Sequence, residues 1–373
     1  MRRPFGFLGA AVLVLAALRL PLGGEAATGF ASHPVLLAAT LAALALFALA
    51  PFAPLRHSLG LPVGFAGVIL TCAVTLRLLV DPGVAGTAGT GFWALVLAGW
   101  LAAALVVTGM AALKLRNETL RRANDLAIPL LFGGFLFYLW EVTVRGFGVP
   151  SVLVPSPSAT AVRFAASLPT LGEDFVQTFV RGVLIGYAIG CGAGFVVAIV
   201  AHRFTFLGRG LLPIGNFVSA LPIVGIAPIM VMWFGFDWPS KVAVVAIITF
   251  FPMLVNTLAG LAAAGPIERD LMRSYGASPA QTLVKLNLPA AMPFIFNALK
   301  INSTLALIGA IVAEFFGTPT RGIGFRISIE VARMSLDMVW AEIALAAIAG
   351  MAFYGIVALA ERATTFWHPS YRT

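Results

Sequence analysis

The chain has 373 residues, of which 60% are hydrophobic and only 10% charged, and its mean hydropathy is +0.98. Soluble domains carry about 25% charged residues, so this composition excludes an ordinary soluble domain and indicates that lipid covers most of the surface. The net charge of +9 does not require nucleic acid, because the basic residues form short clusters between apolar runs, as in membrane proteins.

Runs of about 20 apolar residues predict membrane-spanning helices. We expect ten of them, at 5–22, 35–54, 61–80, 92–113, 126–147, 176–200, 214–234, 241–263, 292–315 and 338–361. Arg2 and Arg3 precede the first run, which is therefore either a cleaved signal peptide or a retained anchor. A second apolar run follows at once and favours the anchor.

The loops indicate how the chain is oriented in the membrane and where it divides into two parts. Lys and Arg are more numerous in the loops that share a side with the N-terminus, so both termini are expected in the cytoplasm of a multi-pass protein. The basic stretch at 114–125 predicts a cytoplasmic linker between an N-terminal extension of about four helices, 1–113, and a core of about six helices, 126–366.

The loop at 265–289 predicts two short helices joined by a fixed bend. Gly276 suits the left-handed residue that ends a helix, and Ser278 with Pro279 form a natural start for the next one. Pro289 is expected to end that second helix before the next span. Such an amphipathic pair is either a surface loop packed on its own bundle or a docking element for a cytoplasmic partner.

The spacing within this loop resembles the cytoplasmic signature of binding-protein-dependent ABC importer permeases. In that family an acidic residue and two small residues precede a glycine, and Ile-x-Leu-Pro follows at a fixed interval. The interval is the same here, although Asp replaces Glu, Leu-Met replaces the two alanines and Leu replaces Ile. The resemblance implies that an ATPase contacts this element, through Asp270, Leu271, Met272, Tyr275, Gly276, Ala277, Ser278, Leu286, Leu288 and Pro289.

Three other segments extend the resemblance over roughly residues 126–366: VPSVLVPSPSATAVRF (149–164), LPIVGIAPIMVMWFG (221–235) and GAIVAEFFGTPTRGIGF (309–325). The last is similar to the subgroup that serves nitrate, sulfonates, taurine and thiamine-precursor pyrimidines. The resemblance implies an all-α type I ABC importer permease core in a bacterial inner membrane.

It also implies partners: a solute-binding protein, a second permease subunit, expected to be a second copy of this chain, and cytoplasmic ATPase subunits. The chain has no G-x-x-x-x-G-K-[S/T] phosphate loop, so ATP and Mg are expected on the partner ATPase and no cofactor on this chain. No metal site is expected either, since Cys72 and Cys191 lie in separate apolar runs and the four histidines are scattered.

Candidate pathway residues follow from polar and helix-breaking side chains within the spans. Pro222 and Pro228 are expected to break one span at a gate, with Asn216 and Ser219 near its inner end. An ordinary kinked packing helix is the alternative. Charged residues within spans are costly and often functional, so Glu141 is also a candidate.

Arg181 and Glu314 share a depth and are predicted to form an ion pair that lines the outer part of the pathway. The alternative is a purely structural pair, or side chains that extend to the membrane surface. One helical face of the span at 292–315 is a candidate pathway wall, made of Lys300, Ser303, Leu307, Ala310 and Glu314.

Two other classes of protein remain as alternatives. An ion- or proton-coupled secondary transporter also has broken helices, but it would be expected to show an internal repeat. A membrane enzyme would need His, Asp or Cys clustered near one face, and no such cluster is seen in the sequence. Neither alternative explains the element at 265–289.

Overall fold

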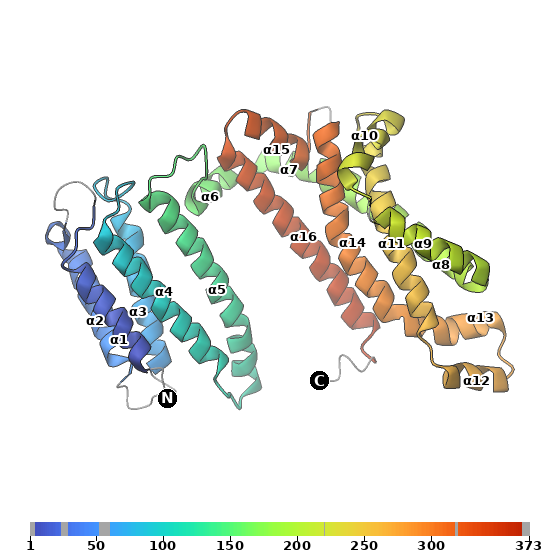
Figure 1. Cartoon of the computed structure of the whole chain (residues 1–373), viewed down its shortest axis with the longest axis horizontal. Helices are drawn as coiled ribbons and strands as arrows, with labels where there is room; N and C mark the ends of the chain where they lie inside the picture. Colours follow the sequence, from blue (N-terminus) through green and yellow to red (C-terminus); the bar gives the residue numbers. More distant parts are fainter. Residues whose placement is uncertain (1–3, 24–28, 52–59, 220, 318–319, 368–373) are drawn as a thin grey trace. The chain divides into compact units, whose positions relative to one another are not determined.

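The computed structural model describes residues 4–23, 29–51, 60–219, 221–317 and 320–367. Most of these residues are helical, and they contain no strand beyond one isolated bridge between Gly23 and Ala88. The all-α prediction is therefore confirmed. The chain forms two compact units, Met1–Ala161 and Val162–Thr373, whose elements are labelled in Figure 1.

The N-terminal unit is a bundle of five helices followed by the start of a sixth. Its elements are α1 (Pro4–Ala17), η1 (Phe30–Ser32), α2 (Pro34–Leu49), α3 (Gly60–Leu78), α4 (Thr90–Ala111), α5 (Glu118–Gly146) and α6 (Pro157–Ala166), which crosses the boundary between the units. Phe47 and Phe92 are fully buried at its centre. Small residues let the helices approach closely: a Cβ on Gly67 would lie 2.6 Å from the Phe47 ring.

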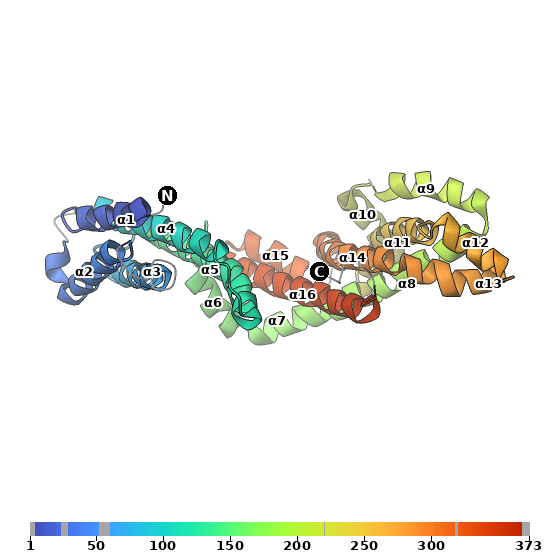
Figure 2. The same cartoon turned by 90° about the horizontal axis from the view of Figure 1, so that it is seen from below.

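The C-terminal unit contains α7 (Leu168–Phe175), the π-helix η2 (Val176–Leu184), α8 (Ile185–Arg203), α9 (Thr205–Ser219), α10 (Ile223–Phe234), α11 (Trp238–Ala262), α12 (Pro266–Ser274), α13 (Pro279–Thr282), the π-helix η3 (Leu283–Asn287), α14 (Leu288–Phe316), α15 (Ile323–Ala332) and α16 (Leu336–Thr364). Within this unit α12 and α13 lie at the opposite end from α15 (Figure 1). Helices α9 and α10 run along one side of α11 (Figure 2).

Helix α11 is central to this unit because α8 and α14 both pack along it. On α8, Gly186, Gly190 and Gly194 recur every four residues and form one face. A Cβ on Gly194 would lie 2.5 Å from the Phe250 carbonyl of α11. Glycine is required there because the two backbones are nearly in contact, as in the small-xxx-small packing of membrane helices.

Seven helical segments of the described chain are long and apolar enough to cross a membrane: Gly60–Leu78, Thr90–Ala111, Glu118–Gly146, Leu168–Arg203, Trp238–Ala262, Pro279–Phe316 and Leu336–Thr364. The predicted runs at 5–22, 35–54 and 214–234 instead contain apolar helices of 10–17 residues. A helix of that length rises less than the roughly 30 Å of the hydrocarbon core.

The predicted span at 214–234 differs most from the structure. The first helix of this region, α9, begins at Thr205 rather than near 214, and a second helix, α10, begins after Pro222. Pro222 is the N-cap residue of α10, with an extended backbone (φ −68°, ψ 124°), and so separates the two helices as predicted. Pro228 lies inside α10 and does not break it, which corrects that part of the prediction.

Candidate functional site

Helix α12 presents an apolar face that nothing in its unit covers. It is a nine-residue helix with no buried residue. Ile267 and the adjoining Tyr275 are each 81% exposed, and Leu271 is 54% exposed. These three side chains are spaced by four residues and therefore lie along one side of the helix. An exposed apolar stripe on a short charged helix is typical of a surface that binds another protein.

The turn after α12 is fixed by its sequence, as predicted. Gly276 has φ +64°, the left-handed conformation that glycine adopts most readily. Ser278 caps α13: its hydroxyl accepts from the N–H of Gln281 at 3.3 Å, and the Gln281 side chain accepts from the N–H of Ser278 at 2.8 Å. Pro279 occupies the first turn of α13. The bend is therefore held by hydrogen bonds and backbone preference.

Pro289 does not end the second helix, so that prediction is wrong. Helix α13 passes through the π-helical turn η3 directly into α14, and Pro289 lies in the first turn of α14. Proline cannot donate a backbone hydrogen bond and crowds the preceding turn of an α-helix. A wider π-helical turn just before it provides room for the ring. The second half of the element is therefore the beginning of a span.

The predicted ATPase-contact residues fall into two groups. Seven are exposed or half-exposed on α12, the bend and the start of α13: Asp270, Leu271, Met272, Tyr275, Gly276, Ala277 and Ser278. Leu286, Leu288 and Pro289 are only half-exposed, on η3 and α14, and Leu288 packs against the core around Met253 and Ile295. The first group is available to a partner, and the second anchors the element to the bundle.

At the other end of the C-terminal unit, a buried polar cluster holds the start of α15. Glu314, 3% exposed, accepts from the hydroxyl of Thr178 at 2.8 Å and 3.0 Å and from the N–H of Gly324 at 2.7 Å. The same Thr178 oxygen accepts from the N–H of Ile323 at 2.8 Å. Gly322 has φ +132°, and a Cβ there would lie 2.5 Å from Glu314 Oε1, so only glycine fits.

Asp174, fully buried on α7, completes this cluster. It accepts from the N–H of Gly322 at 2.6 Å and from Arg326 Nε at 2.8 Å. Glu342 of α16 is buried beside it and faces the charge of Arg326. Three successive N–H groups at the start of α15 are thus bound by side chains from α7, η2 and α14. Helix N-termini favour such acidic partners because their N–H groups have no partner within the helix.

The chain is similar to known transport proteins over most of its C-terminal part. Residues 190–371 match the family described as binding-protein-dependent transport system inner membrane component. The formylaminopyrimidine transport permease protein ThiX of Halalkalibacterium halodurans is 32% identical over 210 residues, which are 55% of this chain and 82% of the relative. The chain belongs to the binding-protein-dependent ABC importer permease family.

Two other relatives agree with this assignment. A probable ABC transporter permease protein of Haemophilus influenzae is 29% identical over 61% of this chain and 91% of its own length. A putative aliphatic sulfonates transport permease protein of Bacillus subtilis is 29% identical over 65% of this chain and 88% of its own length. This protein is thus a multi-pass inner-membrane transport permease, and the comparisons give no support to a secondary transporter.

The predicted pair of Arg181 and Glu314 is wrong for this permease. Arg181 on η2 is exposed, and it donates to Gln177 at 3.3 Å. Within the described residues it makes no ion pair, while Glu314 is fully occupied by Thr178 and Gly324. Arg181 is exposed whereas Glu314 is buried, so the similar depth expected from the sequence did not bring the two side chains together.

The proposed wall on α14 is also packed inside its unit. Ser303 and Ala310 are fully buried, and Leu307 is 8% exposed. Lys300, at one end of the stripe, pairs with Glu361 of α16 at 2.7 Å. The face of α14 that is exposed in this unit is a different one, and it includes Asn297 and Thr304.

Glu141 has a structural role within the N-terminal unit. It accepts from Arg145 at 3.1 Å, and from the N–H and hydroxyl of Ser158 at 2.9 Å and 2.7 Å. These bonds fix the end of α5 to the start of α6, which argues against Glu141 as a pathway residue. Asn216 and Ser219 belong to α9, and their side chains lie outside the described part of the structure.

Sequence reasoning missed most of the polar cluster. Glu342 lies within the predicted span at 338–361, so the rule that charged residues in spans are functional candidates could have found it. Asp174 lies two residues before the predicted start of its span, so the same rule does not point to it. The role of Thr178 has no signal in a single sequence, because a threonine within a helix more often bonds to its own backbone.

Proposed function

We propose that this permease is driven by a separate ATPase that docks on the segment 266–289 and carries the ATP and Mg. The observation that supports this most is the uncovered apolar stripe of Ile267, Leu271 and Tyr275 on α12. A stiff element is needed to transmit movement, and the Gly276 turn with the Ser278 cap makes the bend stiff. The proposal places α12 and both termini in the cytoplasm, as the Lys and Arg distribution indicates.

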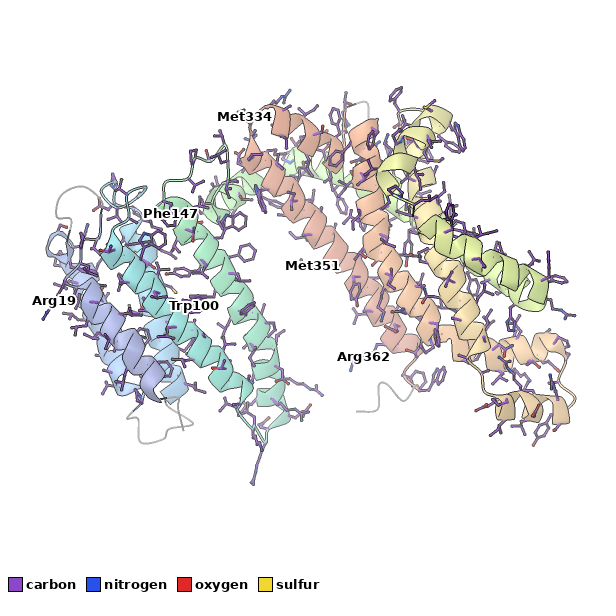
Figure 3. The ribbon with its side chains drawn as sticks, in the orientation of Figure 1. Arg19, Trp100, Phe147, Met334, Met351 and Arg362 are labelled. Carbon is purple, nitrogen blue, oxygen red and sulfur yellow. The ribbon has the colours of Figure 1, made fainter. Side chains whose placement is uncertain are left out.

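Cross-linking tests the docking surface. A photo-reactive amino acid at Tyr275 is expected to capture an ATP-hydrolysing subunit, and Tyr275→Ala to reduce its co-purification about tenfold or more, as expected for a central aromatic contact. Met334→Ala is the matched control, since Met334 is 69% exposed at the turn between α15 and α16, at the opposite end of this unit (Figure 3). Equal losses in both variants, or capture only from position 334, would contradict the proposal.

We further propose that solute passes along the exposed face of α14 and that a second copy of this chain completes the pathway. Asn297 and Thr304 are exposed on this face, and Asn297 donates to Asn256 of α11 at 3.5 Å. The Thr304 hydroxyl donates to the Ile301 carbonyl at 2.8 Å, so the amide of Asn297 is the polar group of this face that is most costly against lipid. Its position favours water or a partner subunit over hydrocarbon.

Cysteine labelling separates the two faces of α14. In a chain whose two native cysteines are replaced, Thr304→Cys is expected to react with a membrane-impermeant thiol reagent. Ser303→Cys, one residue away and fully buried in its unit, is expected to stay unlabelled. If neither position reacts in the assembled transporter at any stage of ATP turnover, this face of α14 is not in contact with water and the pathway proposal is wrong.

The substrate is proposed from the relatives alone. Their names describe permeases for formylaminopyrimidine, aliphatic sulfonates, taurine and bicarbonate. A small anion or a pyrimidine precursor, delivered by a solute-binding protein, fits these names. Uptake of taurine, nitrate and a formylaminopyrimidine can be measured in proteoliposomes that contain the ATPase and the binding protein. The result would distinguish a small anion from a pyrimidine precursor as the substrate. Transport of none of the three would exclude this set.

A further inference from the structure

An apolar groove of about 600 Å³ lies within the N-terminal unit, outside the residues that match the family. It runs between α3, α4 and α5, and 18 residues line it, among them Phe65, Trp100 and Gly134. Trp100 is 50% exposed on α4 (Figure 3). All of the lining residues belong to the N-terminal unit, so the helices of that unit alone form the groove.

The polar groups in the groove wall are already bound within the protein. The Tyr138 hydroxyl hydrogen-bonds to that of Thr75 at 2.8 Å, and the Thr108 hydroxyl donates to the Ala104 carbonyl at 2.8 Å. These hydroxyls therefore have no need of a polar ligand. The remaining lining is largely aliphatic and aromatic, so the shape and chemistry suit a hydrocarbon chain.

A strongly basic loop joins α4 and α5, two of the helices that form the groove. Thr108 lies three residues before the end of α4, and Leu130 is the lining residue of α5 nearest to the loop in sequence, twelve residues after the start of α5. Lys114 and Arg116 in this loop are exposed and make no ion pair within the described residues. The positive charge of this loop is thus available to an external anion.

The neighbouring arginines add to this positive charge. Arg121 and Arg122 share a single acid, Glu118, at 2.6 Å and 2.9 Å. Between residues 114 and 125 the chain carries four basic and two acidic side chains, Lys114, Arg116, Arg121 and Arg122 against Glu118 and Asp125. Clusters of this kind beside membrane helices attract anionic lipid headgroups.

We propose that this groove binds one anionic phospholipid, with an acyl chain between α3, α4 and α5 and its phosphate at Lys114 and Arg116. In a membrane the acyl chain gains little by leaving bulk lipid, since lipid tails are as apolar as the groove. The headgroup contact therefore supplies the selectivity. The proposal does not depend on which solute the permease carries.

Native mass spectrometry of the delipidated transporter, incubated with detergent micelles that contain dioleoyl phosphatidylglycerol or dioleoyl phosphatidylethanolamine, tests this directly. One phosphatidylglycerol is expected to stay bound per chain, with about tenfold less phosphatidylethanolamine. Glycerol phosphate, which has the anionic group and no acyl chain, is expected not to compete. Equal retention of the two lipids, or full competition by glycerol phosphate, would overturn the proposal.

Two adjacent glycines provide a matched pair of variants. A Cβ on Gly133 or Gly134 would meet no atom within 4 Å, but only Gly134 lines the groove. Gly134→Trp is expected to abolish phosphatidylglycerol retention, and Gly133→Trp to preserve it, with unchanged unfolding temperatures. If Gly134→Trp does not fold, Ala104→Phe fills the same groove from α4. Retention of lipid by the filled variants would overturn the proposal.

The charge of the loop between α4 and α5 is tested separately. The double variant Lys114→Gln/Arg116→Gln is expected to reduce phosphatidylglycerol retention about tenfold, whereas Arg362→Gln, an exposed arginine at the end of α16, is the control expected to leave it unchanged. If filling the groove instead removes a co-purifying polypeptide while lipid stays bound, a protein helix occupies the groove and the lipid proposal is wrong.

Discussion

The hydroxyl of Thr178 lies between the carboxylate of Glu314, at 2.8 Å and 3.0 Å, and the backbone N–H of Ile323, at 2.8 Å. One oxygen atom thus links three elements of the C-terminal unit: η2, α14 and α15. All three groups are buried, so water cannot replace a lost partner, and each bond matters more than an exposed one would.

Thr178→Val tests this link. Valine keeps the shape but removes the hydroxyl, which leaves the Ile323 N–H without an acceptor and takes a donor from the Glu314 carboxylate. The expected cost is about 1–3 kcal/mol of stability for one buried unsatisfied group, measured as a lower unfolding temperature in detergent. Thr304→Val, at an exposed position of α14, is the control. Equal shifts in the two variants would show that the buried link contributes nothing.

Gly322→Ala is expected to disturb α15. The glycine has φ +132°, which other residues rarely adopt, and the new Cβ would lie 2.5 Å from Glu314 Oε1. We expect faster proteolysis of the loop before α15 and reduced transport. Gly355→Ala is the control, since a Cβ there would meet no atom within 4 Å. A Gly322→Ala protein as resistant and active as the control would contradict the assigned role.

The ion pair of Lys300 and Glu361 joins α14 to α16 at 2.7 Å. Lys300→Met leaves the Glu361 carboxylate largely buried without this partner. Removing one member of a fully buried pair costs about 3–5 kcal/mol. A smaller loss is expected here because the Lys300 side chain is 20% exposed. The charge-reversed double variant Lys300→Glu/Glu361→Lys should recover part of the unfolding temperature, and no recovery would mean that the charges do not interact.

Ser278→Ala removes the cap of α13. The loss of such a cap typically costs about 0.5–2 kcal/mol, and here it would loosen the bend next to the proposed ATPase contact. We expect less transport per ATP hydrolysed, measured in proteoliposomes. Ser274→Ala is the matched control, because Ser274 bonds only to the Asp270 carbonyl within α12. Equal amounts of transport per ATP hydrolysed in the two variants would show that the Ser278 cap does not contribute to coupling.

Local signals in the sequence predicted local structure well. The bend after α12 was predicted because Gly276 and Ser278 act on the backbone next to them. Pro289 was misread since a proline in the first turn of a helix and a proline after a helix look alike in sequence. The structure differs because the π-helical turn η3 joins α13 to α14.

Contacts between distant residues could not be predicted in the same way. Hydropathy gives the depth of a charged residue in a span but not the side of the helix on which its partner lies. The Arg181–Glu314 prediction failed for this reason. The hydrogen bond between Thr178 and Glu314 joins residues 136 positions apart, and only the folded structure shows it. Glu342 could have been found, because an acid within an apolar run is visible without a structure.

The unbroken helical segment Pro279–Phe316 has 38 residues, or about 57 Å at 1.5 Å per residue. It begins at the capped bend and ends two residues beyond Glu314. A movement of the bend therefore reaches Glu314 through one continuous helical segment, in which the π-helical turn η3 and Pro293 are the points where the helix axis can bend. If an ATPase binds at the bend, no loop interrupts the helical path from that contact to Glu314, which binds the start of α15.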